Sequence, residues 1–316
     1  MSRFSEVFVG LDIAQAHLDL ALWADARAWR FSNDLAGYDA LIDHLRPFAP
    51  TLIVADATGG YERGVVRALQ QAGWAVAVVN PRRVREFARA NGRLAKTDRL
   101  DAHNLAHFAQ AVRPPARPVR TAAQEQLAGL VARRRQILAM LKAEQNRLHQ
   151  LPLALRPGLE AHLAWLTADR DSLNRELAAQ LEGEPVWQAK AALLRSAPAV
   201  GPVTAATLLA EFPELGTLDR KKVAALADLA PMNNDSGHKR GKRRTSGGRG
   251  PLRSTLYMAT LMATRYNPVL EALYQNLLRR GKEKKAALTA CMRKFLTILN
   301  AMLRDNRPWQ PQLAPT

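Results

Sequence analysis

The sequence is poor in cysteine and contains no long uninterrupted apolar run. Its single cysteine, Cys291, has no partner for an internal disulfide, and it excludes the paired-cysteine spacing of a zinc finger. A membrane-spanning helix needs about 18 consecutive apolar residues, and no such run is present. The N-terminal stretch "MSRFSEVFVGLDIAQ" reaches acidic residues too early for a secretory signal. We therefore expect a cytoplasmic protein without a membrane partner.

Acidic residues are also scarce, and the shortage is concentrated at one end of the chain. The 316 residues carry a net charge of +18. From Ser236 to the end there are 17 lysines and arginines against three acids, a net of +14, which leaves about +4 for the first 235 residues. Such an excess favours a polyanionic partner, usually nucleic acid. The C-terminal quarter is its expected binding surface.

The N-terminal third has the pattern of an α/β domain. Apolar or alternating stretches at 7–14, 17–24, 27–33, 51–56 and 74–81 predict strands. Helices are predicted near 37–46, 61–73, 82–91 and 101–111. The resulting order, three strands followed by alternating helices and strands, indicates a mixed sheet.

The remainder of the chain is predicted to be helical. A proline-rich break at 113–119 precedes long helices near 121–149 and 158–181, which form either an antiparallel coiled-coil hairpin or a packed pair within a globular domain. A Pro/Gly turn separates two short apolar helices within 196–212, and a basic, Gly-rich loop occupies 230–251. We expect domains at 1–115, 120–185 and 190–306, and a disordered tail at 307–316.

Four aspartates are candidates for a metal site. Asp12 interrupts a buried strand, where a carboxylate is costly unless it is paired or metal-bound. Asp56 ends the next buried strand, and Asp98 and Asp101 begin a later helix. Together they match a ribonuclease H-like arrangement, whose carboxylates bind Mg²⁺ for phosphodiester chemistry.

Each of these acids also has a plain structural interpretation. Asp12 could cap a turn, and Asp56 could cap the helix that begins near residue 61. Asp98 and Asp101 could be ordinary acids at a helix start, neutralised by the nearby cations Arg93, Lys96 and Arg99. Four other acids are expected on outward or loop positions and are set aside: Asp19, Asp34, Asp43 and Glu62.

Five segments, in order, resemble the insertion-sequence one-ten family of bacterial DEDD transposases. They are "FVGLDIAQAHLDL", "VADATGGYE", "AVVNPRRVREFARANGRLAKTDRLDAHNLAHF", "APAVGPVTAATLLAE" and "GGRGPLRSTLYMA". The resemblance implies a RuvC-like N-terminal domain whose four Mg²⁺-binding acids fall on Asp12, Asp56, Asp98 and Asp101. Asp56 stands where the family commonly has Glu, so its side chain is one methylene shorter.

The resemblance also implies a catalytic serine, because "PMNNDSG" matches a family pattern and places that serine at Ser236. Thr245 and Ser246 in the same loop are the fallback candidates, whereas Tyr257 lies in an apolar run and is expected in the core. The basic residues expected to bind nucleic acid are Lys239, Arg240, Lys242, Arg243, Arg244, Arg249 and Arg253.

In the family, the serine attacks a DNA phosphodiester and forms a covalent phosphoserine link. The resemblance further implies a structured non-coding guide RNA and a homo-oligomer, either a dimer or a tetramer in the active complex. "PAVGPVTAATL" resembles the hairpin of a helix-hairpin-helix, with a plain helical turn as the alternative.

Two other functions fit the same residues. One is a RuvC-like, metal-dependent, structure-specific DNA nuclease that uses water and has no catalytic serine. The other is a basic nucleic-acid-binding scaffold on a degenerate nuclease fold. The order of the motifs and the "PMNNDSG" loop favour the transposase.

Overall fold

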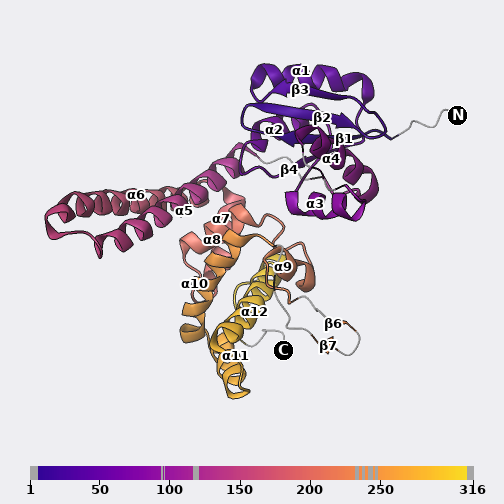
Figure 1. Cartoon of the computed structure of the whole chain (residues 1–316). Helices are drawn as coiled ribbons and strands as arrows, with labels where there is room; N and C mark the ends of the chain where they lie inside the picture. The colour runs from indigo at the N-terminus through magenta and orange to yellow at the C-terminus, as the bar shows by residue number, and fades with distance from the viewer. Residues whose placement is uncertain are drawn as a thin grey trace. The chain divides into compact units, whose positions relative to one another are not determined.

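The computed structural model describes residues 6–93, 95, 97–116, 121–231, 235–236, 239–240, 245 and 248–311 (Figure 1). The chain divides into two compact units, residues 1–120 and 121–316. The finer division at residues 185–190 stays a prediction.

Unit 1 is built on a five-stranded mixed sheet with the strand order β3-β2-β1-β4-β5. Its strands are β1 (Phe8–Ile13), β2 (His17–Leu22), β3 (Ala28–Ser32), β4 (Leu52–Asp56) and β5 (Val76–Val79). The first three strands pair antiparallel as a meander, and β4 and β5 run parallel to β1. This is the ribonuclease H-like sheet that the sequence predicts.

Helices cover both faces of this sheet. Val9, Leu11 and Ile13 of β1 pack into one buried cluster with residues of α1 (Leu35–Leu45) and α2 (Glu62–Gln71). Phe8 belongs to the cluster on the other face, beneath α3 (Pro81–Ala90) and α4 (Asp98–Val112). Because side chains alternate along a strand, Gly10 and Asp12 also lie on the α4 face.

Gly10 is the point at which α4 lies directly on β1. A Cβ atom at Gly10 would lie 2.1 Å from the carbonyl oxygen of Ala102 and 2.3 Å from the backbone nitrogen of Ala106. Only glycine permits this approach of a helix backbone to the strand. The contact holds the first turn of α4, with its two aspartates, above the end of β1.

In unit 2, α5 (Ala122–Leu148) and α6 (Arg156–Gly183) form the predicted antiparallel hairpin, joined through a short 3₁₀ turn, η2 (Leu153–Leu155) (Figure 1). Its far half is held by a small buried cluster that consists of Ile137, Leu141, Leu166 and Leu173. Arg134 of α5 also donates a 2.6 Å hydrogen bond to Asn174 of α6. The helix start at Thr121 carries a complete capping box with Gln124.

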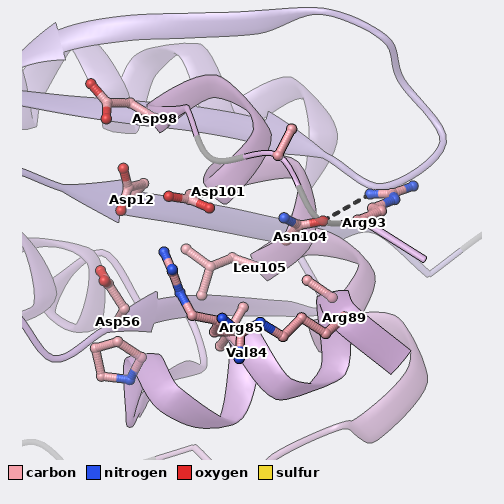
Figure 2. Close-up of a pocket in the computed structure, with 13 residues that line it drawn as sticks. Asp12, Asp56, Val84, Arg85, Arg89, Arg93, Asp98, Asp101, Asn104 and Leu105 are labelled. Carbon is pink, nitrogen blue, oxygen red and sulfur yellow. Dashed lines mark hydrogen bonds between the residues drawn. The ribbon is translucent and has the colours of Figure 1, made fainter. Parts of the chain in front are cut away.

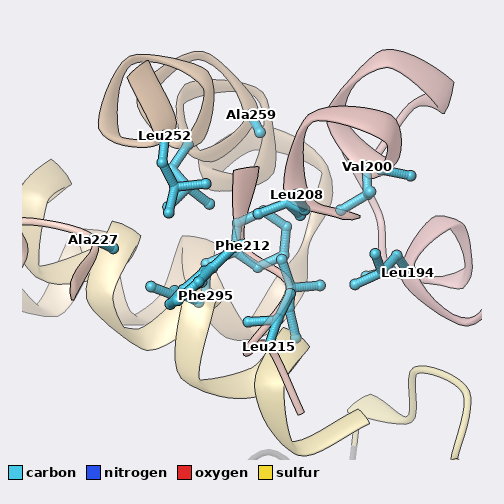
Figure 3. Close-up of a cluster of buried hydrophobic side chains, with 14 of the residues drawn as sticks. Leu194, Val200, Leu208, Phe212, Leu215, Ala227, Leu252, Ala259 and Phe295 are labelled. Carbon is cyan, nitrogen blue, oxygen red and sulfur yellow. The ribbon is translucent and has the colours of Figure 1, made fainter. Parts of the chain in front are cut away.

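The rest of unit 2 packs around one large core. Its helices are α7 (Pro185–Ser196), α8 (Pro202–Glu211), α9 (Arg220–Leu226), α10 (Gly250–Tyr266), α11 (Pro268–Arg279) and α12 (Lys284–Asp305). Phe212 and Phe295 are fully buried near its centre (Figure 3). The predicted turn between two short apolar helices is confirmed by α7 and α8.

The ends of the hairpin and of the chain both join this core. Leu127 of α5 and Leu177 of α6 pack into it. Trp309, in the stretch expected to be disordered, packs against it and donates its backbone N–H to the Ser196 hydroxyl at 2.8 Å. Residues 312–316 of that predicted tail lie outside the described residues.

Helix α12 is, within the described residues, the one helix long and apolar enough to cross a membrane by length and composition. However, 56% of its most apolar window is buried inside the structure. Cys291 lies on this helix and is fully buried. We interpret α12 as a core helix.

Replacing Gly10 with alanine should destabilise unit 1 by about 2–3 kcal/mol, because the added methyl group must displace helix backbone rather than a flexible side chain. Urea unfolding monitored by circular dichroism measures this. Gly129→Ala is the matched control, since this helical glycine has open space around it and alanine should stabilise α5 by about 0.5–1 kcal/mol. An equal change in the free energy of unfolding in the two variants would refute the role assigned to Gly10.

Candidate active site

The four predicted aspartates line one cavity of about 170 Å³ in unit 1 (Figure 2). Asp12 comes from β1 and Asp56 from the end of the adjacent parallel strand β4. Asp98 and Asp101 lie in the first turn of α4, which crosses above these strands. Residues that are up to 89 positions apart in the sequence are thereby brought to one site.

Neither helix that begins near these acids has one of them as its N-cap residue. Thr97, not an aspartate, caps α4 by accepting the N–H of Leu100. The first residue before α2, Tyr61, makes no side-chain capping bond, and Glu62 instead accepts the N–H groups of Thr58 and Gly60. Asp98 and Asp101 do lie in the first turn of α4, as the plain helix-start interpretation expects.

Arg93 and Arg99, two of the cations that could neutralise Asp98 and Asp101, have other hydrogen-bond partners. Arg93 donates to the side chain of Asn104 at 3.1 Å, and Arg99 donates to the carbonyl oxygen of Ala26 at 3.0 Å. Arg30 of β3 contacts Asp98 instead, at a long 3.5 Å. Lys96 lies outside the described residues.

Crowding and burial disfavour the ionised forms of the central carboxylates. Burial, followed by the negative charges of Asp56, Asp101 and Asp98, raises the pKa of Asp12 from 3.8 to about 7. Burial is also the main cause that raises the pKa of Asp56 to about 6. A bound cation would reverse both shifts.

The donor set fits a divalent cation such as Mg²⁺. Carboxylate oxygens are the hard ligands that this ion prefers. In addition, the Oδ1 atom of Asp56 is buried without a hydrogen-bond partner among the described residues. Such an atom is costly unless something binds it.

Asp19 was expected on an outward position, and this prediction was wrong. It is 5% exposed, lies opposite Asp12 in the β1–β2 ladder, and receives two 2.9 Å hydrogen bonds from Arg30. The alternation of Leu18, Leu20 and Leu22 places Asp19 on the other face of β2. That face is covered by α4, which alternation along β2 alone does not reveal.

His17, Asp19 and Asp98 form a second cluster beside the four acids. Each offers one possible ligand atom within 4.8 Å of the others. Nε2 of His17 lies 3.5 Å from Asp19 Oδ2 and 3.6 Å from Asp98 Oδ2. The Arg30 guanidinium also donates one hydrogen bond to each oxygen of Asp19.

Ser236, the predicted nucleophile, lies in unit 2. It is exposed, on a two-residue strand β6 (Asp235–Ser236) that pairs with β7 (Lys239–Arg240). Thr245, a fallback candidate, accepts a 2.8 Å hydrogen bond from Arg253. Ser246, the other fallback, lies outside the described residues, as do the predicted phosphate-binding residues Lys242, Arg243 and Arg244.

Two of the predicted nucleic-acid-binding arginines are engaged in ion pairs within unit 2. Arg249 makes a bidentate pair with Glu214, at 2.6 and 2.9 Å. Arg253 donates at 2.8 Å to the carboxylate of Asp228. Their contact with nucleic acid stays a prediction, as it does for Lys239 and Arg240, whose side chains lie outside the described part.

Tyr257 was expected in the core, and this prediction was wrong. Within the described part of α10, the buried side chains are those of Leu252, Leu256, Ala259, Thr260, Ala263 and Thr264. Tyr257 lies beside these residues and is 37% exposed.

Two family models match the chain. One, described as a transposase of the DEDD IS110 type, matches residues 9–157, and the other, described as the transposase IS116/IS110/IS902 family, matches residues 191–275. Among curated relatives, the pilin gene-inverting protein of Moraxella lacunata is 26% identical over 98% of this chain and 99% of its own length. An insertion element IS110 protein of Streptomyces coelicolor is 29% identical over 50% of this chain and 38% of its own length.

Among solved structures, Thermus thermophilus RuvC is 17% identical to this chain. The match covers 35% of this chain and 98% of RuvC, with a TM-score of 0.28.

The raised pKa values predict how stability depends on pH and on metal. Between about pH 4 and 7 the folded, metal-free protein binds more protons than the unfolded chain, so its free energy of unfolding should fall as pH rises through this window. Mg²⁺ should therefore raise the melting temperature more at pH 8 than at pH 5. Differential scanning fluorimetry measures both effects.

Removing one charge from the cluster should stabilise the metal-free protein. At pH 8, we expect Asp12→Asn to raise the free energy of unfolding by about 1–2 kcal/mol, a value reduced from the full pKa difference because Asp12 is partly solvated. The same variant should lose much of the response to Mg²⁺. Asp39→Asn, at an exposed position on α1, is the control and should change neither property. Destabilisation by Asp12→Asn would contradict the electrostatic picture.

Proposed function

Because the chain belongs to the IS110 family of transposases, we propose that it cuts and rejoins DNA through a covalent phosphoserine intermediate formed by Ser236. In this proposal, Mg²⁺ is held by Asp12, Asp56, Asp98 and Asp101. The proposed role of the four aspartates rests on one observation: their carboxylates line one cavity.

The carboxylates supply the site with hard oxygen ligands on a rigid support. Two of them project from adjacent strands of the central sheet, and two from one turn of α4. Mg²⁺ bound there would supply Lewis-acid stabilisation of the phosphoryl oxygens. The burial that raises the pKa values of Asp12 and Asp56 also excludes water, which strengthens electrostatic interactions at the site.

The serine supplies the covalent step. Its Oγ forms a bond to the phosphorus of the scissile phosphodiester, while the bond from phosphorus to the leaving sugar oxygen breaks and that oxygen takes up a proton. Attack by the sugar hydroxyl of the new strand reverses these changes and frees the serine. Since one phosphoester is exchanged for another, rejoining needs no ATP.

Two features support the serine chemistry over a water-using nuclease. The side chain of Ser236 is exposed, and five cations follow it within the next eight residues: Lys239, Arg240, Lys242, Arg243 and Arg244. Cations at this spacing suit a phosphate that gains charge in the transition state. The relatives named for pilin gene inversion also carry a name that requires both cutting and rejoining of DNA.

The proposed partners are DNA, a structured non-coding guide RNA and further copies of the chain. The net charge of +14 after residue 235 supports backbone contacts to nucleic acid, which position it without reading its sequence. Exposed apolar side chains on the helical hairpin, Leu138, Met140 and Trp165, support assembly into a dimer or tetramer. We place the protein in the cytoplasm, where it meets chromosomal DNA.

A covalent trap tests the proposed reaction. The protein would be expressed together with the DNA that flanks its gene, so that any guide RNA is made, and then incubated with labelled element-end DNA and Mg²⁺. After denaturation, we expect label to migrate with the protein. Ser236→Ala and Asp101→Asn should each reduce this signal by at least about 100-fold, since losing one transition-state interaction costs about that much.

Matched controls exist for both variants. Ser254→Ala removes another exposed serine of unit 2, and Asp39→Asn removes an exposed acid of unit 1; neither should reduce the covalent product. Free cleaved DNA that persists in Ser236→Ala would instead identify a nuclease that uses water. Covalent protein–DNA product that persists in Asp101→Asn would show that the acid cluster is not needed for the reaction.

A further inference from the structure

The wall of the acid cavity opposite α4 is formed by α3, and it is rich in arginine. Val84 and Ala88 of this helix are buried against the sheet face, while Arg85 and Arg89 line the cavity together with the four aspartates. Figure 2 shows Arg85 extending from α3 toward the carboxylates, with Arg89 one helical turn further along. Acids and arginines therefore face one space from different elements.

The other arginines in this region already have partners. Arg82 donates to Glu86 of the same helix at 2.7 Å, and Arg83 lies over the ring of Phe108 at 5.6 Å. By contrast, Arg85 and Arg89 are exposed and form no hydrogen bond or ion pair within the described ranges of the chain. Binding an anion would cost neither of them an existing contact.

The two arginines are not ion-paired with the aspartates, although they line the same cavity. A ligand that binds to both walls must present negatively charged oxygens to the guanidinium groups. It must also coordinate a cation that the carboxylates hold. A phosphodiester meets both conditions, since its oxygens bind arginine and Mg²⁺ alike. Residues four apart on a helix lie about 6 Å from each other, so Arg85 and Arg89 can contact neighbouring phosphates of one strand.

We propose that Arg85 and Arg89 bind the backbone phosphates of the DNA strand that is cut, and so hold it over Asp12, Asp56, Asp98 and Asp101. This inference rests on the proposed function and adds to it a DNA-binding surface in unit 1. All the nucleic-acid contacts predicted from the sequence lie after residue 235. In this role the two arginines position the scissile phosphodiester.

The salt dependence of DNA binding tests the proposal without requiring chemistry. The full-length protein would be titrated into a fluorescein-labelled duplex from the DNA flanking its gene, in Ca²⁺ and at several salt concentrations. If both arginines contact phosphates, Arg85→Ala/Arg89→Ala should lower the slope of log K against log salt by about 1.8, because each contact contributes about 0.9.

The matched control removes two arginines of the same helix that already have partners. Arg82→Ala/Arg83→Ala makes the same change in net charge and should leave the slope nearly unchanged. An equal fall of the slope in both double variants would mean that α3 acts only through its overall charge. No fall in either would mean that α3 does not contact the DNA. Both results overturn the proposal.

Photocrosslinking locates the contact and identifies the nucleic acid. An aryl azide would be attached to the thiol of Arg89→Cys in the full-length protein. Cys291 should stay unlabelled, because it is fully buried and burial raises the pKa of its thiol to about 11. Asp39→Cys on α1, which packs on the opposite face of the sheet, is the control.

We expect crosslinks to DNA from position 89 and none from position 39. Crosslinks that go only to co-purifying RNA, or that are equal at both positions, would overturn the proposal. Adding Ser236→Ala to Arg89→Cys should abolish the covalent reaction and keep the crosslink. Failure of the serine mechanism can therefore be distinguished from failure of this DNA-binding surface.

Discussion

The candidate active site depends on the contact between the backbone of α4 and Gly10 of β1. The missing side chain at Gly10 lets the helix lie on the strand, with no space left for even one methyl group. This contact fixes the height of α4 above the sheet, and therefore the distance of Asp98 and Asp101 from Asp12. A cluster of carboxylates assembled from two strands and a helix requires such a constraint, because carboxylates a few ångströms apart repel one another.

Much of the site could be predicted from the sequence, because the relevant signals are local. Asp12 stands out as a charge within an apolar strand, Asp56 as the last residue of another, and Asp98 and Asp101 as acids at a helix start. Asp19 was missed because alternation assigns residues to two faces of a strand but does not say which face a distant helix will cover. Tyr257 was misplaced for a related reason: when nearly every residue of a helical turn is apolar, the pattern does not reveal the buried side.

The partners of the cations were harder to predict than the positions of the acids. Arg249 and Arg253 follow a basic loop and were grouped with it by sequence proximity, yet their partners Glu214 and Asp228 lie 35 and 25 residues away. Arg30 binds Asp19 across a strand pair in the same way. Ion pairs of this kind depend on the tertiary fold, so charge counts along a chain overstate how many cations are free to bind a ligand.

The contact at Gly10 also has a consequence for the order in which the molecule forms. The β1–β2–β3 meander joins neighbours in the sequence, and β4 and β5 add to it by short crossovers, so the sheet can assemble while translation continues. The helix that packs on Gly10, α4, is synthesised about ninety residues later. Until α4 packs on the sheet, Asp12 and Asp56 are not repelled by the charges of Asp98 and Asp101. A newly made chain can thus complete its sheet first, and the repulsion among the four carboxylates of the candidate site arises only in a late step, when the surrounding residues are already packed.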